Sequence, residues 1–144
     1  MENISNIMSI SFGISGDKLL PNEITNLLKI TPTKAWKKGD TYKSKYRNKN
    51  GSFEFRELKR PAGIWELSSL EEVLSNKLED HASFIIQKLE SSMNQIDKIL
   101  SQSSMRTSIN IWWQPEDGYG GYTLSADTIR KLSLLCNEMD FYFS

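Results

Sequence analysis

The stretch Thr107-Ser108-Ile109-Asn110-Ile111-Trp112-Trp113-Gln114 alternates apolar and polar side chains, and this alternation decides the fold. Successive side chains of a β-strand point to opposite faces of the sheet, so residues 107, 109, 111 and 113 share one face. That face carries the aliphatic side chains and is expected to be buried. The indole of Trp112 is then expected on the opposite, open face.

Two other segments show the same period of two. From Met8 to Ser15, four apolar residues alternate with serine and glycine, which predicts a strand whose second face is lined by small side chains. From Met139 to Phe143, apolar residues alternate with Asp140 and Tyr142, which predicts a last strand. Tyr142 is therefore expected on the open face together with Trp112.

Helical signals separate these strands. Pro21 suits the first turn of a helix, which Pro32 ends, and Ser69 opens a capping box that predicts a helical region. One long helix is expected over residues 78–100, because apolar residues recur there every three or four positions. Ser125 is expected to cap a third helix whose inward residues are Ile129, Leu132, Leu135 and Cys136. The glycine-rich segment 115–121 is interpreted as a loop.

Residues from about Lys34 to Lys45 and from Phe53 to Leu67 predict the two strands of a long hairpin. Asn48 to Gly51 supply a tip that tolerates positive φ, and Pro61-Ala62-Gly63 predicts a break in the second strand. The expected order is β-α-β-β-α-β-α-β. It predicts an α+β fold in one domain spanning residues 1–144, with a ferredoxin-like, antiparallel-rich sheet and helices on one face.

The charge is unevenly distributed although the net charge is zero. Between residues 34 and 60 ten Lys or Arg stand against three acidic residues, so the rest of the chain carries the opposite excess. Such a charge dipole steers partners and does not decide the fold. A single cysteine, the lack of an export pattern at the start and the lack of a long apolar run lead us to expect a cytoplasmic protein outside the membrane.

The residues that usually carry chemistry are sparse, so we expect no catalytic site, metal or cofactor. The lone histidine, His81, is interpreted as a partly exposed helical residue, and Cys136 as a packing residue. Adjacent acidic pairs such as Glu71/Glu72 do not share a helix face and are interpreted as solvated charge. An enzyme therefore ranks third among the possible functions, after the two binding functions given below.

Two tryptophans, Trp36 and Trp65, bracket the basic hairpin and are interpreted as packing its base, with a binding role as the alternative. Lys38-Gly39-Asp40 is interpreted as a turn fixed by the aspartate side chain, again with binding as the alternative. The candidate partner-binding residues are basic, aromatic or turn-forming: Trp36, Lys38, Gly39, Asp40, Lys43, Lys45, Arg47, Trp65, Trp112 and Tyr142.

Several short motifs resemble a bacterial family known as domain of unknown function 4279. They lie, in order, at residues 16–25, 28–33, 38–40, 63–65, 122–125 and 139–142. The match spans nearly the whole chain. The resemblance implies a small bacterial protein without an established reaction. Proteins of this kind are often immunity partners that block a cognate toxin, and that expectation rests on analogy.

Two functions of different classes remain open. The first is a protein-binding module, most concretely an immunity protein that neutralises a toxin by occlusion. The second is a nucleic-acid binder in which exposed aromatic side chains stack on bases. Its phosphate contacts would come from basic residues of the hairpin: Lys34, Lys37, Lys38, Lys43, Lys45, Arg47 and Lys49. A monomer and a dimer are equally compatible with the sequence.

Overall fold

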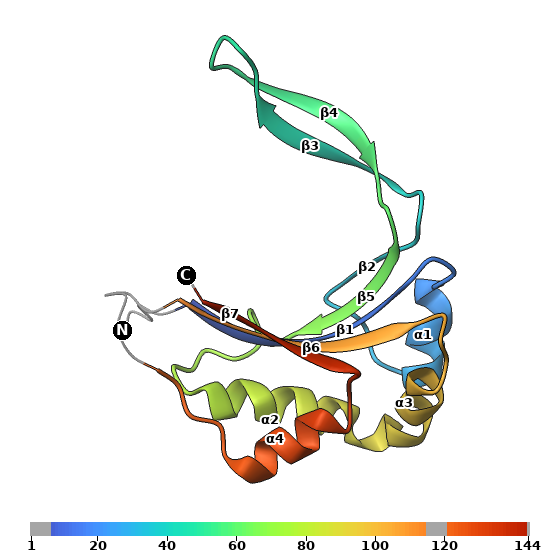
Figure 1. Ribbon diagram of the computed structural model, residues 1–144, viewed down its shortest axis with the longest axis vertical. Helices are drawn as coiled ribbons and strands as arrows, with labels where there is room; N and C mark the ends of the chain where they lie inside the picture. The colour runs from blue at the N-terminus through green and yellow to red at the C-terminus, as the bar shows by residue number, and fades with distance from the viewer. Residues whose placement is uncertain (1–6, 115–120, 144) are drawn as a thin grey trace.

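The computed structural model describes residues 7–114 and 121–143 (Figure 1). Its strands are β1 (Ile7–Gly16), β2 (Lys34–Trp36), β3 (Thr41–Arg47), β4 (Phe53–Lys59), β5 (Gly63–Ser68), β6 (Arg106–Gln114) and β7 (Glu138–Phe143). Its helices are α1 (Pro21–Leu28), α2 (Leu78–Leu89), the short 3-10 helix η1 (Glu90–Ser92), α3 (Met93–Leu100) and α4 (Ala126–Ser133). The expected α+β class is confirmed.

Five strands form the main sheet in the order β2-β5-β1-β6-β7. β1 lies in the centre and pairs antiparallel with β5 and β6, while β2 pairs antiparallel with β5. This is the ferredoxin-like arrangement predicted from the element order. β7 adds a fifth strand, parallel to β6, which is possible because α4 forms the crossover between them.

The strand phases match the alternation in the sequence. Ile10, Phe12, Ile109 and Ile111 are fully buried on the face that the helices cover. Their cross-strand register, Ile10 opposite Ile111 and Phe12 opposite Ile109, places them together on that face. In Figure 1 all four α-helices lie on this side of the sheet, which leaves the other face open. The prediction that Trp112 points away from the helices is confirmed by its 45% exposure.

The long helix expected over residues 78–100 is broken. α2 ends at Leu89, and η1 separates it from α3. Ser92 is buried within this break, and its hydroxyl donates to the carbonyl oxygen of Leu28 at the end of α1, at 2.9 Å. Serine has modest helix propensity, and this hydrogen bond satisfies one of the carbonyls that a helix end leaves free. The apolar period continued across the break because α2 and α3 both pack beneath the same sheet.

The long hairpin is also divided. Its base belongs to the main sheet as β2 and β5, whereas β3 and β4 form a separate two-stranded sheet. Figure 1 shows this ribbon, here called the arm (residues 41–59), rising from the sheet and curving back above its open face. The break predicted at Pro61-Ala62-Gly63 is present. Gly63 is required there, because a Cβ atom would lie 2.9 Å from the carbonyl oxygen of Gly16.

Three smaller expectations differ from the structure. The capping-box segment at Ser69 forms only one turn, because the Ser69 hydroxyl accepts from the backbone N–H of Ile10 instead of capping a helix. The helix begins later, at Leu78. Ile129 is exposed on α4, where Thr128 and Leu132 face inward instead. The predicted loop at 115–121 falls outside the described residues, apart from Gly121.

Ser125 caps α4 as expected, and α2 contributes to the same helix start. The Ser125 hydroxyl accepts from the backbone N–H of Thr128 at 3.1 Å. Glu79 of α2 accepts from the backbone N–H of Ser125 and, at 2.8 Å, from the hydroxyl of Thr128. These hydrogen bonds, the Ser125 N–H first, lower the pKa of Glu79 from its ordinary value.

The lowered pKa of Glu79 predicts that the protein loses stability as the pH falls into the acid range. A carboxyl group whose pKa is lowered by folding stabilises the protein above its unfolded pKa, and this contribution is lost as the pH falls through the folded value. Wild-type melting temperature is therefore expected to decline below about pH 4.5, the ordinary pKa of the group, more steeply than that of Glu79→Gln. Thermal unfolding followed by circular dichroism from pH 7 to acid measures this. The arm variant Glu57→Gln is the matched control, and equal acid-side slopes for the wild type and Glu79→Gln would contradict the prediction.

Candidate partner-binding surfaces

Two aromatic side chains stand together on the open sheet face. Trp112 of β6 and Tyr142 of β7 occupy paired positions, and their ring centroids lie 6.2 Å apart. Both are about half exposed. Ser9 lies opposite Trp112 on β1, so the side chain beside this pair is small. Exposed aromatic groups next to small polar side chains are suited to anchoring a partner.

The base of the arm is held by a stacked guanidinium group. Arg60 lies 3.8 Å from the ring centroid of Trp36 and 3.7 Å from that of Tyr42. Arginine over an aromatic face gains cation–π energy, more so where water is partly excluded. Trp36 ends β2 and Tyr42 belongs to β3, so this stack spans the break between the main sheet and the arm. Half-buried Trp36 therefore has a structural role, and its binding role stays a prediction.

Lys38-Gly39-Asp40 forms the turn between β2 and β3. The Asp40 N–H donates to the Lys37 carbonyl oxygen at 3.2 Å, and the Asp40 carboxylate accepts from the Lys37 N–H at 3.0 Å. Gly39 has a φ of 88°, which favours glycine. Lys38 forms an exposed ion pair with Asp17 at 3.5 Å. The turn interpretation is confirmed, and Arg60 extends it, since the Gly39 N–H donates to the Arg60 carbonyl oxygen at 2.9 Å and the Arg60 N–H donates to that of Asp40 at 2.8 Å. A binding role for these residues stays a prediction.

Lys43, Lys45 and Arg47 share one face of β3, because they alternate along the strand. Phe53 and Phe55 of β4 lie opposite Arg47 and Lys45, so these five side chains form what we call the basic face of the arm. The Lys45 ammonium group is 4.2 Å from the Phe53 ring centroid, and the Arg47 guanidinium carbon is 5.1 Å from it. Both phenylalanines are more than half exposed. Neither phenylalanine was predicted as a binding residue, although their two-residue spacing on the expected strand would have placed them beside the basic residues.

The tip of the arm is ordered by its own side chains. Glu54 accepts from the Tyr46 hydroxyl at 2.7 Å and from the Asn48 side-chain amide at 2.8 Å. These hydrogen bonds, that from Tyr46 first, lower the pKa of Glu54. Asn48 also accepts from the backbone N–H of Asn50 at 2.9 Å, and Gly51 has a φ of 81°. The tip therefore has a defined turn of the kind expected for Asn48 to Gly51.

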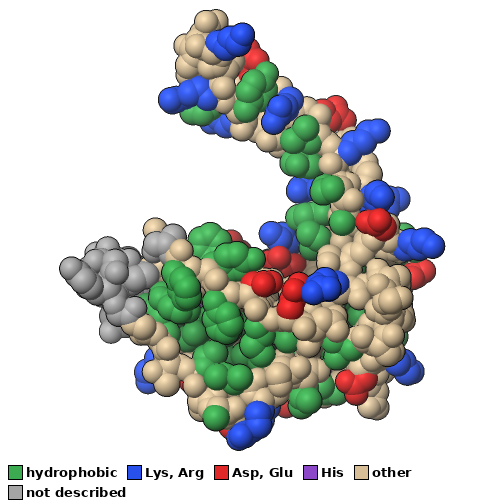
Figure 2. All heavy atoms as spheres, in the orientation of Figure 1, with side chains coloured by type: hydrophobic (Ala, Val, Ile, Leu, Met, Phe, Trp, Pro, Cys, Tyr) green, Lys and Arg blue, Asp and Glu red, His purple; other side chains and the backbone are tan. Residues whose placement is uncertain are grey.

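The open-face aromatic pair and the basic face do not form one continuous patch. The pair lies at the β6–β7 side of the sheet, whereas the arm springs from β2 and β5 at the other side. Figure 2 shows the arm curving over the body, so that a concave space lies between the two. A partner that touches both surfaces has to enter this space.

Trp65 does not belong to either surface. Its side chain is fully buried, its indole N–H donates to the Thr25 hydroxyl at 3.0 Å, and its ring meets Phe12 edge to face. Since Trp65 lies on the helix side of β5, a partner cannot reach it in this fold. Its inclusion among the binding residues is therefore corrected, and the packing interpretation is the right one.

His81 is buried and hydrogen-bonded, not partly exposed as the sequence suggested. Its Nδ1 lies 2.7 Å from the Ser69 hydroxyl oxygen, and its Nε2 lies 2.9 Å from the Ser75 carbonyl oxygen. Because a carbonyl only accepts, Nε2 carries a proton, and in the neutral ring Nδ1 then accepts from the Ser69 hydroxyl. A serine–histidine pair is also found at nucleophilic sites, but Ser69 is fully buried and its oxygen accepts from the Ile10 N–H at 2.9 Å. The pair is therefore structural.

Cys136 is half-buried, and burial raises the pKa of its thiol. A nucleophilic cysteine needs the opposite shift, so the packing interpretation stands. Within residues 7–114 and 121–143, no group of three His, Cys, Asp or Glu side chains is placed to hold a metal ion. In the same ranges no helix has the length and apolarity to cross a membrane.

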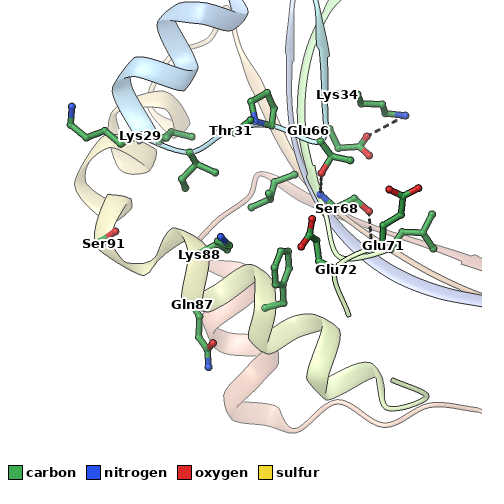
Figure 3. A pocket seen from close by; sticks show the side chains of 17 residues that line it. Lys29, Thr31, Lys34, Glu66, Ser68, Glu71, Glu72, Gln87, Lys88 and Ser91 are labelled. Atoms are coloured by element: carbon green, nitrogen blue, oxygen red, sulfur yellow. Dashed lines mark hydrogen bonds and ion pairs between the residues drawn. The ribbon is translucent and has the colours of Figure 1, made fainter. Parts of the chain in front are cut away.

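A cleft of about 1030 Å³ opens beside the end of α1, and the sequence did not predict it. Figure 3 shows it between the Lys29–Lys34 segment, the end of β5 and α2. Its charged lining is mixed, with lysines and glutamates in equal number: Lys29, Lys34, Lys88, Glu66, Glu71 and Glu72. Lys34 and Glu66 form an ion pair at 3.7 Å. This balance of charge favours no particular class of ligand.

The fold and these surfaces define a small ferredoxin-like α+β domain that carries a projecting basic arm. Residues 5–143 match the family model described as Domain of unknown function (DUF4279), so the chain belongs to this family. The resemblance found in the sequence is thereby confirmed. Searches of curated proteins and of solved structures gave no significant match.

Proposed function

We propose that this protein is a binding module that engages an acidic protein surface through its arm. The observation that carries the proposal is the basic face, on which Lys45 and Arg47 flank exposed Phe53 on a ribbon that projects from the body. Between residues 41 and 60 the chain has seven Lys or Arg and two Glu. Complementary charge speeds encounter with an acidic partner, and the aromatic rings add buried apolar area on contact.

The architecture of the arm supports this role. Within the described residues, β3 and β4 pair with each other and with no other strand. An isolated two-stranded hairpin is marginally stable in water, so the ribbon needs reinforcement. The stack of Arg60 between Trp36 and Tyr42 supplies it at the base. A projecting element that contributes little to the core is suited to contacting another molecule.

The open face supplies a second anchor. Trp112 and Tyr142 lie on the open face, above which the arm curves, and tryptophan and tyrosine are enriched among residues that dominate interface energies. A partner segment inserted into the concave space between the arm and the body would contact the basic arm and the aromatic pair together. Such an interface blocks whatever site the partner presents, which is the action of an immunity protein that neutralises a toxin by occlusion. No catalytic residue is needed for it.

The proposal predicts that charge reversal on the arm weakens capture of the partner. Tagged wild type recovered from the native host should carry a stoichiometric acidic partner. We expect Lys45→Glu/Arg47→Glu to bind it at least about tenfold more weakly, because two interface charges become repulsive. Quantitative pull-down followed by titration calorimetry with the identified partner measures this.

Lys88→Glu/Lys98→Glu is the matched control, since it makes the same charge change on exposed positions of α2 and α3. It is expected to retain the partner. The proposal fails if wild type recovers no stoichiometric protein, or if the arm variant and the control retain the partner equally. Identification of a secreted toxin as the partner would establish the immunity role, and a partner without toxic activity would exclude it.

Nucleic acid is the second candidate, and the interleaving of Phe53 with Lys45 and Arg47 favours it. Single-stranded nucleic acids bind where aromatic rings stack on bases and cations track the backbone. A titration of a labelled single strand should then show a log–log salt slope of about −4 if six phosphates are contacted. An affinity that does not change with salt, or no binding below about 10 μM, excludes this function.

A further inference from the structure

The outer edge of β7 is an unpaired and strongly apolar strand edge. No described strand pairs with it, since β7 ends the sheet. Three consecutive side chains on it are exposed: Phe141 by 54%, Tyr142 by 49% and Phe143 by 64%. Figure 2 shows hydrophobic side chains gathered where Figure 1 places β7 and α4.

The other strand edges of the molecule carry the features that prevent pairing. β2, at the opposite end of the sheet, has only three residues and begins with Lys34. The arm strands carry charged residues along their length, such as Lys43 and Glu57. Short edge strands and charged edge residues are the usual protection against edge-to-edge association. β7 has less of this protection. Glu138 is neutralised by a bidentate contact with Arg106 at 2.8 and 2.9 Å, which leaves Asp140 as the second charged residue of the strand.

The sequence of β7 is complementary to itself when it is read antiparallel. If Phe141 pairs with its own copy, Met139 faces Phe143 of the second copy on the helix side. On the open side, Asp140 faces Tyr142 of the second copy, where the phenol can donate to the carboxylate. Like charges do not meet in this register, and directly opposite residues share a face of the sheet.

We propose that a second copy of this chain docks on β7 and joins the two sheets across a twofold axis at Phe141. Residues 139–143 of β7 would pair with the same five residues of the second copy, and the aromatic side chains would cover one another. Phe143 is already oriented by Trp113, whose ring centroid lies 4.3 Å away. The dimer uses no residue of the arm, and it shares Tyr142 with the aromatic pair of the open face.

The exposed apolar area on β7 can supply a large part of a dimer interface. Aromatic side chains bury about 150–250 Å² each, so three that are half exposed offer roughly 300 Å² per copy. A specific interface buries at least about 1,000 Å² in total, so the paired strand backbones and the side chains around them have to supply the remainder. Burial of a hydrophobic edge in this way also removes a template for aggregation.

Sedimentation velocity tests the proposal. Wild type at up to about 100 μM should sediment at twice the 16.6 kDa chain mass. Phe141→Glu and Phe141→Lys should each be monomeric, because two like charges then meet at the twofold axis. An equimolar mixture of the two variants should restore the dimer, because opposite charges then meet there.

Phe55→Glu is the matched control, since it puts the same charge at an exposed phenylalanine on the arm, and it should remain dimeric. Circular dichroism establishes that each variant is folded before sedimentation, and restoration in the mixture shows this as well. The proposal is overturned if wild type is monomeric at every concentration. It is also overturned if Phe141→Glu stays dimeric, or if the mixture of charge variants remains monomeric.

Discussion

Replacing Trp65 by alanine is expected to lower the free energy of unfolding by about 4 kcal/mol, the middle of the range for a buried tryptophan truncated in a core. The indole is fully buried and closes the core between β5 and α1. Removing the indole leaves a cavity beside Phe12. It also leaves the Thr25 hydroxyl without the N–H group that donates to it. For a domain of this size such a loss lowers the melting temperature by roughly 10 °C.

Urea denaturation followed by circular dichroism measures this change. Trp65→Phe retains much of the aromatic area but cannot donate to Thr25. Its free energy of unfolding should therefore lie between those of the wild type and Trp65→Ala. Trp112→Ala is the control, because the Trp112 indole is 45% exposed on the open face and surface changes usually stay within about 0.5 kcal/mol. Equal losses at positions 65 and 112 would contradict the assignment of the two faces.

This contrast shows what strand periodicity can predict. In β6 the alternation assigns Trp112 to the open face from the sequence alone, and the same alternation aligns Ile109 and Ile111 with the helices. In β5, Trp65 directly follows the apolar Ile64, so the apolar pattern does not mark its phase as clearly. The pairing of Trp65 with Ala35 and Ile14 fixes its side, and pairing is a property of the assembled sheet.

Helix continuity and polar networks were harder to predict for a related reason. The period of three to four residues continues from Leu89 to Met93, so it gave no sign of the break at Ser92. That break depends on a hydrogen bond to Leu28, 64 positions earlier in the chain. The burial of His81 likewise depends on Ser69 and on the backbone of Ile10, which only the folded chain brings together.

The candidate surfaces were predicted in part. The charge excess between residues 34 and 60 indicated a basic segment where the arm lies. The spacing of its basic residues by two indicated that they share one face of a strand. The same rule applies to Phe53 and Phe55, which the charge analysis passed over. The exposure of Phe141 and Phe143 could not be inferred from alternation, because their phase is the buried one. They are exposed because β7 is the last strand of the sheet, and strand order is a tertiary property.

Ser69→Ala is expected to lower the free energy of unfolding by about 2–4 kcal/mol, because two buried polar groups lose their partner at once. The Ile10 N–H lies 2.9 Å from the Ser69 hydroxyl oxygen, and His81 Nδ1 lies 2.7 Å from it. Each buried group left without a hydrogen bond costs about 1–3 kcal/mol. The network also ties β1 to the segment before α2, so its loss should loosen the centre of the sheet. Hydrogen exchange of the Ile10 amide, together with urea denaturation, measures both effects.

A double-mutant cycle measures the interaction energy between Ser69 and His81 separately from their other contacts. His81→Leu removes the second partner, and in Ser69→Ala/His81→Leu the groups left without their bonds are the Ile10 N–H and the Ser75 carbonyl oxygen that His81 Nε2 contacts. The double variant should therefore cost less than the sum of the single changes, with a coupling of about 1 kcal/mol or more. Ser101→Ala is the control, because its exposed hydroxyl bonds only the Lys98 carbonyl at the end of α3, at 2.8 Å. A Ser69→Ala loss no larger than that of Ser101→Ala, or strict additivity in the cycle, would show that the buried serine–histidine pair does not hold β1 in place.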